Sequence, residues 1–502
     1  MTIPKNKYWF LFLTIILLIT ITGCHKSSSN DNIPPPNLLP TITNFTPANA
    51  NIGSQVVITG TNFSTSPSGN IVKFNGITAS VITASSTQLT ASVPVGATTG
   101  RITVTVGSQT AAAATDFIVT VTANLPVITS ISTTTGRPGD QVIILGANFN
   151  NIASFDTVRF NGILAFVTIA SPTQLTVRIP AGASSGNISV TVNGLTSTSS
   201  ITFIISDYQV STFTGSGVGG LLDNVGTAAK FSYPEGIAKD NSGNLYVADQ
   251  YNRSVRKITP SGLVSTVATF ANPSSTPNGL AVDASGNIYV TERDINIIRK
   301  ISSSGVISDL TGTGLFNYPL DVAVDAAGNV FVTDWGNRRI RKVTPAGVVT
   351  TFAGSDTSLT YDGTGLGSRF IGPRGITIDA AGNLYVTDYS KIRKITPTGV
   401  VSTIAGSNAG YADGPALSAM FFNPKGIAID ASGNIFIADK VKIRKLTTDG
   451  FVITIAGTGN YGFANGPGSM AEFDYAEGLV VDASGNIFIA DNTNNRIRKI
   501  TF

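Results

Sequence analysis

A phrase centred on Gly-Asn recurs six times in residues 207–502, and this repetition restricts the possible folds more than any other feature of the chain. Its fullest form, GNIFIAD, occurs letter for letter at 433–439 and again at 485–491. The six copies lie at Gly243-Asn244, Gly286-Asn287, Gly328-Asn329, Gly382-Asn383, Gly433-Asn434 and Gly485-Asn486. Repeats of roughly 40–50 residues with several short strands each are typical of β-propellers and solenoids. We therefore expect one small β-sheet for each copy.

The order of apolar and turn residues is shared by the copies. They follow P-x-G-[IL]-A-[VI]-D, then G-N-[IL]-[YF]-V-[AT]-D, then I-R-K-I, then V-V-S-T-I-A-G, with substitutions. This order resembles the NHL repeat, a family whose members build β-propellers, and the resemblance covers all of residues 207–502. Some relatives of that family are metal-dependent lyases with histidine ligands. Those ligands cannot be carried over, because the only histidine of this chain is His25.

The two ends of the repeat segment distinguish a closed ring from an open stack. The sixth copy stops at residues 500–502, directly after its third expected strand. A spare fourth strand, QVSTFTG at 209–215, precedes the first copy and matches VVSTIAG at 400–406. Pairing the two would cover both open edges, which otherwise favour aggregation. The sequence therefore predicts a six-bladed propeller that is closed by its N-terminal strand.

Residues that every copy shares are expected to be scaffold. The apolar run of GNIFIAD predicts a strand buried on both faces, and the acid at its end is expected to accept backbone hydrogen bonds in the following loop. These strand-end acids are Asp249, Asp334, Asp388, Asp439 and Asp491. Four connecting loops also share a phrase that ends on a phenylalanine, which is expected to be buried. They span 223–231, 362–370, 413–421 and 465–473.

Residues 40–122 and 126–206 are two copies of a different unit, offset by 86 residues. Alternating apolar residues in segments such as QVVITG and RITVTV predict about seven short strands per copy. The phrases G-x-N-F and F-N-G resemble the IPT/TIG family of immunoglobulin-like domains, which implies two tandem β-sandwiches in an all-β protein. We expect Gly60 and Gly146 to allow turns, and Phe63 and Phe149 to fill the two cores.

The N-terminal residues 1–23 are typical of an export signal, because Lys5 and Lys7 precede an apolar run at 8–21. That run is shorter than the roughly 20 residues that span a bilayer. The letters ITGC then resemble the lipobox of bacterial lipoproteins, which implies that Cys24 is acylated; a free thiol is the alternative. Residues 24–39 form a Pro/Ser-rich tether. The sequence thus predicts a protein of the cell envelope, anchored by lipid to the outer membrane.

Charge and composition exclude several classes of function. Residues 207–502 contain 25 Lys and Arg residues against 25 Asp and Glu residues, so the propeller carries no net charge. This balance offers no basic surface for nucleic acid. Because the only cysteine is Cys24 and the only histidine is His25, serine triads, Cys-His pairs and His-ligated zinc cannot form in the propeller.

Ligand-binding residues are expected where the copies differ. In a four-stranded blade, the loop after the second strand and the loop between blades lie on the same face of the ring. The predicted site on that face consists of Trp335, Tyr251, Tyr389, Arg253, Arg293 and Arg338. Aromatic rings stack on sugars or aromatic side chains, while guanidinium groups bind hydroxyls and carboxylates. The alternative is that each aromatic residue packs on its own loop and the arginines are solvated.

Two carboxylates depart from the repeat. Glu292 replaces the strand-end aspartate in the second copy, and Asp321 stands where the other five copies have glycine. Together they could hold a calcium ion or act as an acid/base pair, and simple drift of the repeat is the alternative. No other metal or cofactor is expected.

The sequence favours a binding protein over an enzyme. The propeller face would recognise a glycan or a protein, and the two sandwiches would act as spacers. A carboxylate- or calcium-dependent hydrolase or lactonase that uses Glu292 and Asp321 is the second interpretation. A structural or adhesive surface protein is the third.

Overall fold

The structure, a computed structural model, describes residues 39–120 and 124–502. The export signal, Cys24 and the tether up to residue 38 lie outside the described residues, so their predictions stay predictions. The chain divides into two compact units, Met1–Ala123 and Asn124–Phe502. Within the described residues, no helix combines the length and apolarity needed to cross a membrane. Helical structure there is limited to short 3₁₀ turns: η1 (Pro67–Gly69), η2 (Ala153–Phe155), η3 (Gly226–Ala228), η4 (Gln250–Asn252), η5 (Trp335–Asn337), η6 (Gly365–Gly367) and η7 (Gly468–Met470).

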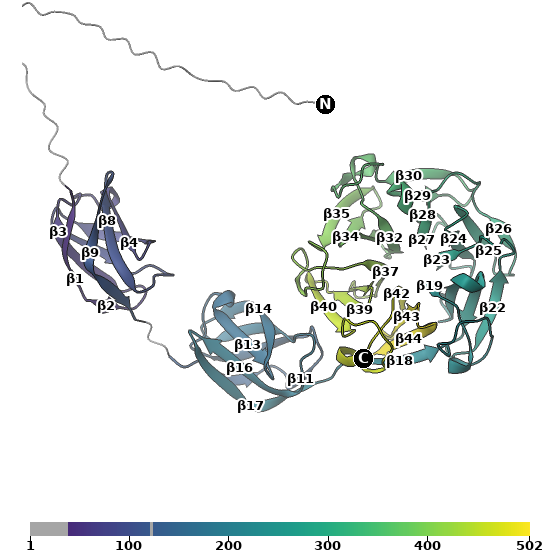
Figure 1. The fold of residues 1–502 in the computed structure, drawn as a ribbon, viewed down its shortest axis with the longest axis horizontal. Helices are drawn as coiled ribbons and strands as arrows, with labels where there is room; N and C mark the ends of the chain where they lie inside the picture. Colours follow the sequence, from purple (N-terminus) through teal and green to yellow (C-terminus); the bar gives the residue numbers. More distant parts are fainter. Residues whose placement is uncertain (1–38, 121–123) are drawn as a thin grey trace, which may run out of the picture. The chain divides into compact units, whose positions relative to one another are not determined.

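The described part of the first unit is a β-sandwich of two sheets (Figure 1). One sheet has the order β1 (Thr41–Thr46), β3 (Gln55–Thr61), β7 (Gln88–Ser92), β6 (Val81–Ala84). The other has the order β2 (Asn49–Ala50), β9 (Gln109–Val119), β8 (Gly100–Val106), β4 (Asn70–Phe74), β5 (Ile77–Ala79). Phe63 is buried in the core between the sheets, as predicted.

The second unit begins with a sandwich of the same kind. Its strands are β10 (Val127–Ile131), β12 (Gln141–Ala147), β15 (Gln174–Arg178), β14 (Ile163–Ser171), β13 (Asp156–Phe160), β16 (Gly186–Val192), β17 (Leu195–Ile205) and β11 (Thr135–Gly136). The two layers are joined here because β14 pairs with β13 at one end and with β15 at the other. Phe149 lies in the core, as predicted.

Gly60 and Gly146 do not form turns, which corrects the expectation for both. Each lies inside a strand, opposite a register shift in its partner strand. A Cβ on Gly60 would lie 1.8 Å from the carbonyl oxygen of Thr41 and 2.5 Å from the ring of Phe63. Glycine is therefore required because the neighbouring backbone and the core phenylalanine approach too closely for a side chain.

Residues 207–502 fold into six antiparallel sheets arranged around a common axis (Figure 1). Sheets one to three are β19 (Pro234–Lys239), β20 (Leu245–Asp249), β21 (Ser254–Ile258), β22 (Val264–Thr269); β23 (Pro277–Val282), β24 (Ile288–Glu292), β25 (Ile297–Ile301), β26 (Ile307–Asp309); and β27 (Pro319–Val324), β28 (Val330–Asp334), β29 (Arg339–Val343), β30 (Val349–Ala353). Sheets four and five are β32 (Pro373–Ile378), β33 (Leu384–Asp388), β34 (Lys391–Ile395), β35 (Val400–Ala405), β31 (Gly363–Thr364); and β37 (Pro424–Ile429), β38 (Ile435–Asp439), β39 (Lys442–Leu446), β40 (Phe451–Ala456), β36 (Gly414–Pro415). The sixth is β42 (Ala476–Val481), β43 (Ile487–Asp491), β44 (Arg496–Thr501), β18 (Gln209–Thr214), β41 (Gly466–Pro467).

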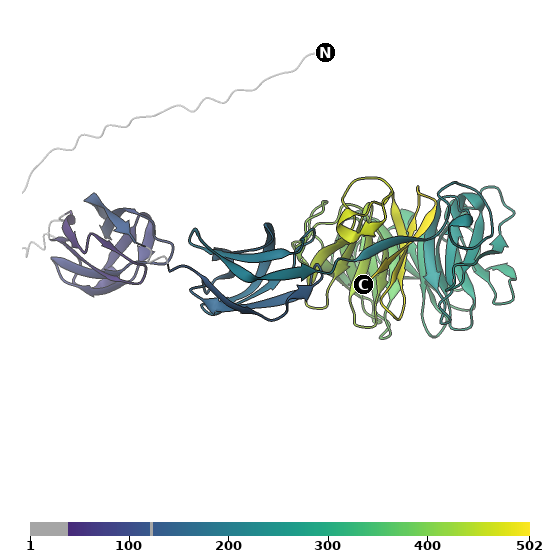
Figure 2. The same cartoon turned by 90° about the horizontal axis from the view of Figure 1, so that it is seen from below.

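The ring is closed by the strand that the sequence predicts. β18 pairs antiparallel with β44, for example Val210 with Ile500, and it also pairs with the short β41. The innermost strands contact one another in the order β19, β23, β27, β32, β37, β42 and back to β19. Figure 2 shows the ring from its side, with loops projecting from both faces. Both ends of the repeat segment therefore lie within one sheet, and its first and last strands are paired.

The repeated phrase GNIFIAD forms the second strand of its sheet, as predicted. All five residues of β38 and all five of β43 are buried. The Asp-x-x-Gly-Asn turn before this strand is held by its aspartate, since Oδ1 of Asp482 accepts from the amides of Ser484 and Asn486 at 2.9 and 2.8 Å. Gly485 has φ +86°, which explains the glycine.

The second sandwich contacts the ring at its fifth sheet, within the second unit. Arg178 pairs with Asp449, and the rings of Phe166 and Phe451 meet edge to face with centres 5.2 Å apart. This sandwich is thus packed against the propeller by apolar and charged contacts.

Candidate functional site

The strand-end acids belong to an internal frame rather than to a ligand site. Asp249 is fully buried and accepts from the guanidinium of Arg256 at 2.6 Å and from the amide of Ser232 at 2.7 Å. Arg256 continues outward to Asp223 and lies over the ring of Phe231, with 5.1 Å to the ring centre. One clamp therefore explains the strand-end acid, the Arg of I-R-K-I and the loop phrase 223–231. Burial raises the pKa of Asp249 despite these donors.

Equivalent clamps occur in the other sheets. The pairs are Asp334 with Arg341, Asp388 with Arg393, Asp439 with Arg444 and Asp491 with Arg498. The backbone donors lie in the loop before the innermost strand, as Ser232 does, and not in the loop that follows the acid. This corrects the expectation for these acids. The reason is that the end of the second strand is adjacent to the start of the first, as in the pairing of Pro234 with Asp249.

Glu292 fills the same structural role in the second sheet. Its buried carboxylate receives hydrogen bonds from Ser275 and Arg299, and Arg299 also pairs with Asp309. Glu292 is absent from the lining of the axial cavity described below, whereas Asp321 lines it. The structure therefore does not bring the predicted acid/base pair together. Among the described residues, no group of three or more acids, histidines and cysteines is arranged to hold a metal ion.

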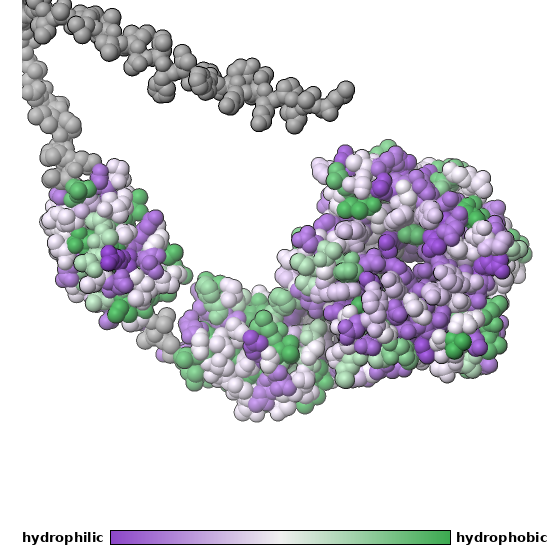
Figure 3. Space-filling model, in the orientation of Figure 1, coloured by the Kyte–Doolittle hydropathy of each residue, from purple (hydrophilic) through white to green (hydrophobic). Residues whose placement is uncertain are grey.

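An axial cavity of about 600 Å³ lies inside the ring and is lined by the innermost strands of all six sheets. The face of the ring seen in Figure 3 is hollowed at its centre and surrounded mainly by hydrophilic residues. At one end of the cavity, the second residue of each innermost strand varies, with five residue types in the six sheets. These residues are Glu235, Asn278, Leu320, Arg374, Lys425 and Glu477, and we call them the rim. The volume is in the range of small-molecule sites.

The rim contains two neighbouring acids, Glu235 and Glu477, whose pKa values are both raised. The Glu235 and Glu477 carboxyl groups are hydrogen-bonded to each other, and Lys425 contacts Glu477. Burial, together with the neighbouring charge of Glu477, raises the pKa of Glu235 to about 8. Burial also raises the pKa of Glu477, although Lys425 opposes this. Near neutral pH Glu235 is therefore mostly protonated, since two adjacent carboxylates resist ionising together.

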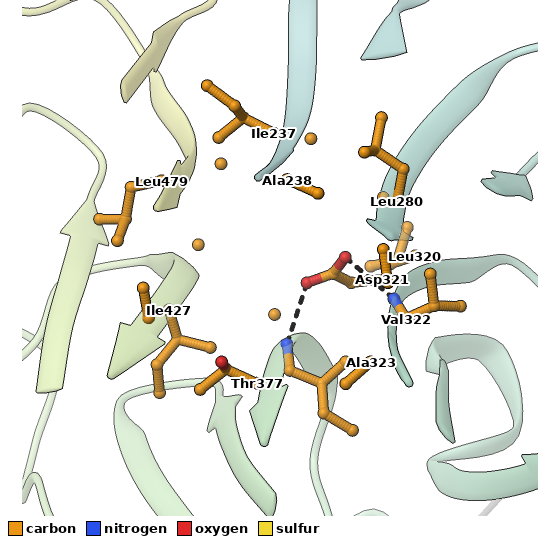
Figure 4. A pocket seen from close by; sticks show the side chains of 18 of the residues that line it. Ile237, Ala238, Leu280, Leu320, Asp321, Val322, Ala323, Thr377, Ile427 and Leu479 are labelled. Carbon is orange, nitrogen blue, oxygen red and sulfur yellow. Dashed lines mark hydrogen bonds between the residues drawn. The ribbon is translucent and has the colours of Figure 1, made fainter. Parts of the chain in front are cut away.

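Asp321 lies in the cavity wall, below the rim. Its carboxylate accepts from the amide of Val322 at 2.9 Å and from the amide of Ile376 on the next innermost strand at 3.0 Å (Figure 4). Figure 4 also shows apolar side chains of other innermost strands around it. Burial raises the pKa of Asp321 to about 7, against both hydrogen bonds.

The glycines at the positions equivalent to Asp321 have a packing reason. A Cβ on Gly375 would lie 2.1 Å from the carbonyl oxygen of Lys425, and one on Gly426 would lie 2.2 Å from that of Glu477. At this level each innermost strand touches the backbone of the next. Asp321 is accommodated because its carboxylate binds the facing amide of Ile376, so this departure from the repeat places an acid in the cavity wall.

Asp321→Asn is expected to change how stability depends on pH. The pKa of Asp321 is raised in the folded protein, so its stabilising neutral form is fully present below about pH 4 and is lost as pH rises through about 7. The free energy of unfolding of the variant relative to wild type should therefore increase by about 2 kcal/mol from pH 5 to pH 8. Urea unfolding followed by Trp335 fluorescence measures this. The exposed Asp356→Asn serves as control, and equal curves for the two variants would contradict the assignment.

Two residues of the predicted ligand site lie at the cavity mouth. Trp335, which is 40% exposed, and Arg293 both line the cavity, together with Tyr318. The rings of Tyr318 and Trp335 are edge to face, with centres 6.3 Å apart. Nε of Arg293 donates to Asp294 at 2.9 Å. An aromatic surface and a guanidinium group thus border the rim.

The other four predicted residues do not line the cavity. Tyr251 stacks on Tyr233 with ring centres 4.4 Å apart, and Arg338 donates to the carbonyl oxygen of Asp356 at 3.3 Å. Tyr389 and Arg253 have left-handed backbone conformations, with φ of 58° and 52°. Tyr251 therefore packs on the loop before β19 and not on its own loop.

Sequence reasoning missed the rim, although a signal for it was present. The rim residue is the x of P-x-G, and it is the variable position between two residues that the copies largely share. It also missed tyrosines directly before innermost strands, Tyr233, Tyr318 and Tyr475, whose φ angles are 55°, 51° and 57°.

Comparison with known proteins identifies the domains. Residues 40–119 and 126–205 match the IPT/TIG domain, residues 316–343 and 473–500 match the NHL repeat, and residues 361–415 and 411–471 match the teneurin NHL domain. A curated relative, Protein SUPPRESSOR OF QUENCHING 1, chloroplastic, from Arabidopsis thaliana, is 34% identical over 91 residues. The match covers 18% of this chain and 9% of that protein.

Solved structures share the fold at low sequence identity. One is a protein of unknown function from Bacteroides thetaiotaomicron, with TM-score 0.50, 24% identity and coverage of 76% of this chain and 99% of that chain. Another is an auxiliary nutrient binding protein from Bacteroides thetaiotaomicron, with TM-score 0.50, 19% identity and coverage of 76% and 98%. These likenesses concern the fold alone. The chain thus contains two IPT/TIG domains followed by a C-terminal β-propeller domain built of NHL repeats.

Proposed function

We propose that the protein is a binding protein of the bacterial cell envelope whose propeller takes a small polar ligand, a sugar or the end of a glycan, at the mouth of the axial cavity. One observation carries this proposal. The rim residues, which differ between sheets, converge on one cavity together with Trp335 and Arg293, while the strand-end acids that the sheets share are buried in clamps. Residues that vary between repeats are suited to ligand recognition, since the shared acids are already bonded to the arginines of their own sheets.

The chemistry of the mouth suits a sugar. Trp335 and Tyr318 offer aromatic surface, and Arg293 and Arg374 offer planar donors for hydroxyl or carboxylate oxygens. The acids Glu235 and Glu477 can accept hydroxyl protons as hydrogen bonds. A solved structure of similar fold is described as an auxiliary nutrient binding protein, which agrees with binding as the general function.

Hydrolysis is the second candidate, because two neighbouring acids, Glu235 and Glu477, lie at the rim and the pKa of Glu235 is raised to about 8. Its geometry favours binding instead. The carboxyl groups of glycosidases stand about 5 Å or more apart, so that substrate or water fits between them, whereas these two are hydrogen-bonded directly. Release of new reducing ends from oligosaccharides, abolished in Glu235→Gln, would favour hydrolysis over binding alone.

Envelope anchoring through an acylated Cys24 is part of the proposal, with the outer membrane as the location and the sandwich domains as spacers. The support is the lipobox-like ITGC after an apolar run that is too short to span a bilayer. Mass spectrometry of the N-terminal peptide tests it. A diacyl or triacyl mass on Cys24, absent in Cys24→Ser, is expected, and an unmodified thiol would refute lipid anchoring.

Arg374→Ala is expected to weaken sugar binding at least about tenfold, because charge-assisted hydrogen bonds are worth about 1.5–3 kcal/mol. The measurement is the change in tryptophan fluorescence on titration with a panel of mono- and oligosaccharides, after subtraction of the signal of Trp335→Phe. Arg338→Asn is the matched control, since Arg338 lies outside the cavity and Asn tolerates its φ of 53°.

A saturable signal that Arg374→Ala reduces and Arg338→Asn leaves unchanged would support the site. A signal that Arg338→Asn reduces and Arg374→Ala leaves unchanged would favour the ligand site predicted from the sequence, to which Arg338 belongs. Absence of any response across the panel would remove sugars as the ligand class.

A further inference from the structure

Aromatic side chains surround a lysine ammonium group on the loop surface beside the fifth and sixth sheets. Nζ of Lys440 lies 4.5 Å from the ring centre of Phe422, 5.1 Å from that of Tyr461 and 5.8 Å from that of Tyr475. Tyr411 stacks on Phe422 with ring centres 5.3 Å apart. Phe422, Tyr461 and Tyr475 are 46, 49 and 37% exposed. We call these four aromatic residues and Lys440 the aromatic cluster.

The aromatic cluster and the rim are on the same face of the ring. Lys440 directly follows β38, the second strand of its sheet, and Tyr475 directly precedes the innermost strand β42. The ends of these strands lie together, because the first residue of an innermost strand pairs with the last residue of the second strand, as Ala476 does with Asp491. The amide of Ala476 also donates to the carbonyl oxygen of Lys440 at 2.6 Å, which ties the two loops to each other.

Tyr475 connects the aromatic cluster to the rim. It stands two residues before the rim residue Glu477, and Nζ of the rim residue Lys425 lies 5.4 Å from its ring centre. The ring centres of Tyr475 and Tyr461 are 5.5 Å apart, so Lys425, Tyr475 and Tyr461 form a continuous row from the rim to the cluster. The exposed rings thus extend a site rather than form an isolated patch.

The lysines of this surface are partnered by rings. Within the described residues, neither Lys440 nor Lys442 forms an ion pair with a carboxylate, and Nζ of Lys442 lies 5.2 Å from the ring centre of Tyr411. A hydrogen bond from Lys440 lowers the pKa of the Tyr461 hydroxyl. An ammonium group held over aromatic rings keeps its charge available for an anion, because the rings neutralise none of it. The cluster therefore combines flat apolar faces with the positive charge of Lys440.

We propose that the aromatic cluster binds further units of an acidic oligosaccharide, one that carries carboxylate groups on its sugar rings, while the end of that chain occupies the axial cavity. The inference rests on the proposed function and deepens it. Exposed aromatic faces suit the flat apolar faces of successive sugar rings, and Lys440 is placed to pair with their carboxylates. Arg374 on the rim adds positive charge on the same face.

The test compares galacturonic acid, its linear α-1,4-linked tetramer and neutral maltotetraose, each titrated into the full chain by calorimetry. The expected result is that tetragalacturonate binds at least about tenfold more tightly than the monomer and than maltotetraose, with affinity falling as salt rises, because exposed charges are screened. A tetramer of mannuronate is included as a second acidic chain, because the arrangement of the cluster does not specify which linkage between the sugar rings it would bind. A preference for the neutral tetramer, or equal affinity for monomer and tetramers of both acids, would overturn the inference.

Variants locate the effect. Lys440→Asn, which tolerates the φ of 62° at this position, and Tyr461→Ala should each lower the affinity for the acidic tetramer about tenfold and leave monomer binding unchanged. Tyr361→Ala, which removes an exposed tyrosine outside the cluster and the axial cavity, is the matched control and should change neither. Unchanged tetramer affinity in both cluster variants would overturn the assignment to this surface.

The same titrations separate this inference from the proposed function. If Arg374→Ala weakens the monomer but the cluster variants do not affect the tetramer, the cavity is the site and the cluster is not. If the cluster variants weaken the tetramer while Arg374→Ala changes nothing, the acidic chain binds at the cluster and its placement in the cavity is wrong.

Discussion

Val210→Asp is expected to lower the free energy of unfolding of the propeller by at least about 3 kcal/mol, because an unpaired carboxyl group would be buried in the seam that closes the ring. Val210 is 2% exposed, pairs with Ile500 of β44 and packs in the core between the fifth and sixth sheets. The measurement is urea unfolding followed by Trp335 fluorescence, which reports on the ring and not on the sandwiches.

Ser211→Asp is the matched control, since Ser211 is the next residue of β18 and its side chain is exposed. It should change stability by less than about 0.5 kcal/mol. Removal of residues 207–215 should have a larger effect than Val210→Asp, because it leaves the edges of β44 and β41 without a partner. Equal unfolding midpoints for the two point variants would show that closure by β18 contributes little to stability.

Arg393→Met is expected to cost about 3–5 kcal/mol, the usual penalty for removing one partner of a buried ion pair. Arg393 and Asp388 are both fully buried, and Arg393 also bonds to Asp362 at 2.9 Å and lies over the ring of Phe370. Its loss would leave a buried carboxylate without its cation and the loop 362–370 without its anchor. Chemical unfolding followed by Trp335 fluorescence measures the effect.

The pH dependence of this variant identifies the mechanism. Burial already raises the pKa of Asp388 in the presence of Arg393, and removal of the cation would raise it further. Because a raised folded pKa stabilises an acid only while it is protonated, the destabilisation should be smallest near pH 4 and grow toward pH 8. Lys394→Met, at the neighbouring residue whose ammonium lies over Tyr385, should cost less than about 1 kcal/mol at either pH. A pH-independent loss in Arg393→Met would point to lost packing instead.

Loop length distinguishes two aromatic residues of the predicted ligand site. Trp335 and Tyr389 both follow the acid at the end of the second strand, so the repeat aligns them. The connection at Trp335 spans 335–338 and contains the turn η5, whereas the connection at Tyr389 spans only 389–390. In the shorter connection Tyr389 takes a φ of 58°, and only Trp335 lines the cavity.

Glu292 illustrates a different failure. Its glutamate differs from the aspartate of the other copies, and this difference suggested function. In the structure the longer side chain of Glu292 still pairs with Arg299 of its own sheet, so it has the same structural role as the aspartates of the other sheets. Asp321 differs from glycine in the same way, yet its carboxylate lies in the cavity wall, where it accepts from the amide of Ile376 on the next innermost strand.

The sequence alone determined the buried strands of the repeat and the sandwich domains, because these follow from the local periodicity of apolar residues. It also determined the strand that closes the ring, because the segment begins with an extra fourth strand and its sixth copy ends without one. Only the tertiary structure decided which variable residues meet. The rim residues and the aromatic cluster come from separate repeats, and their distance from the axis is set by the packing of sheet against sheet, which leaves no trace in the spacing of residues along the chain.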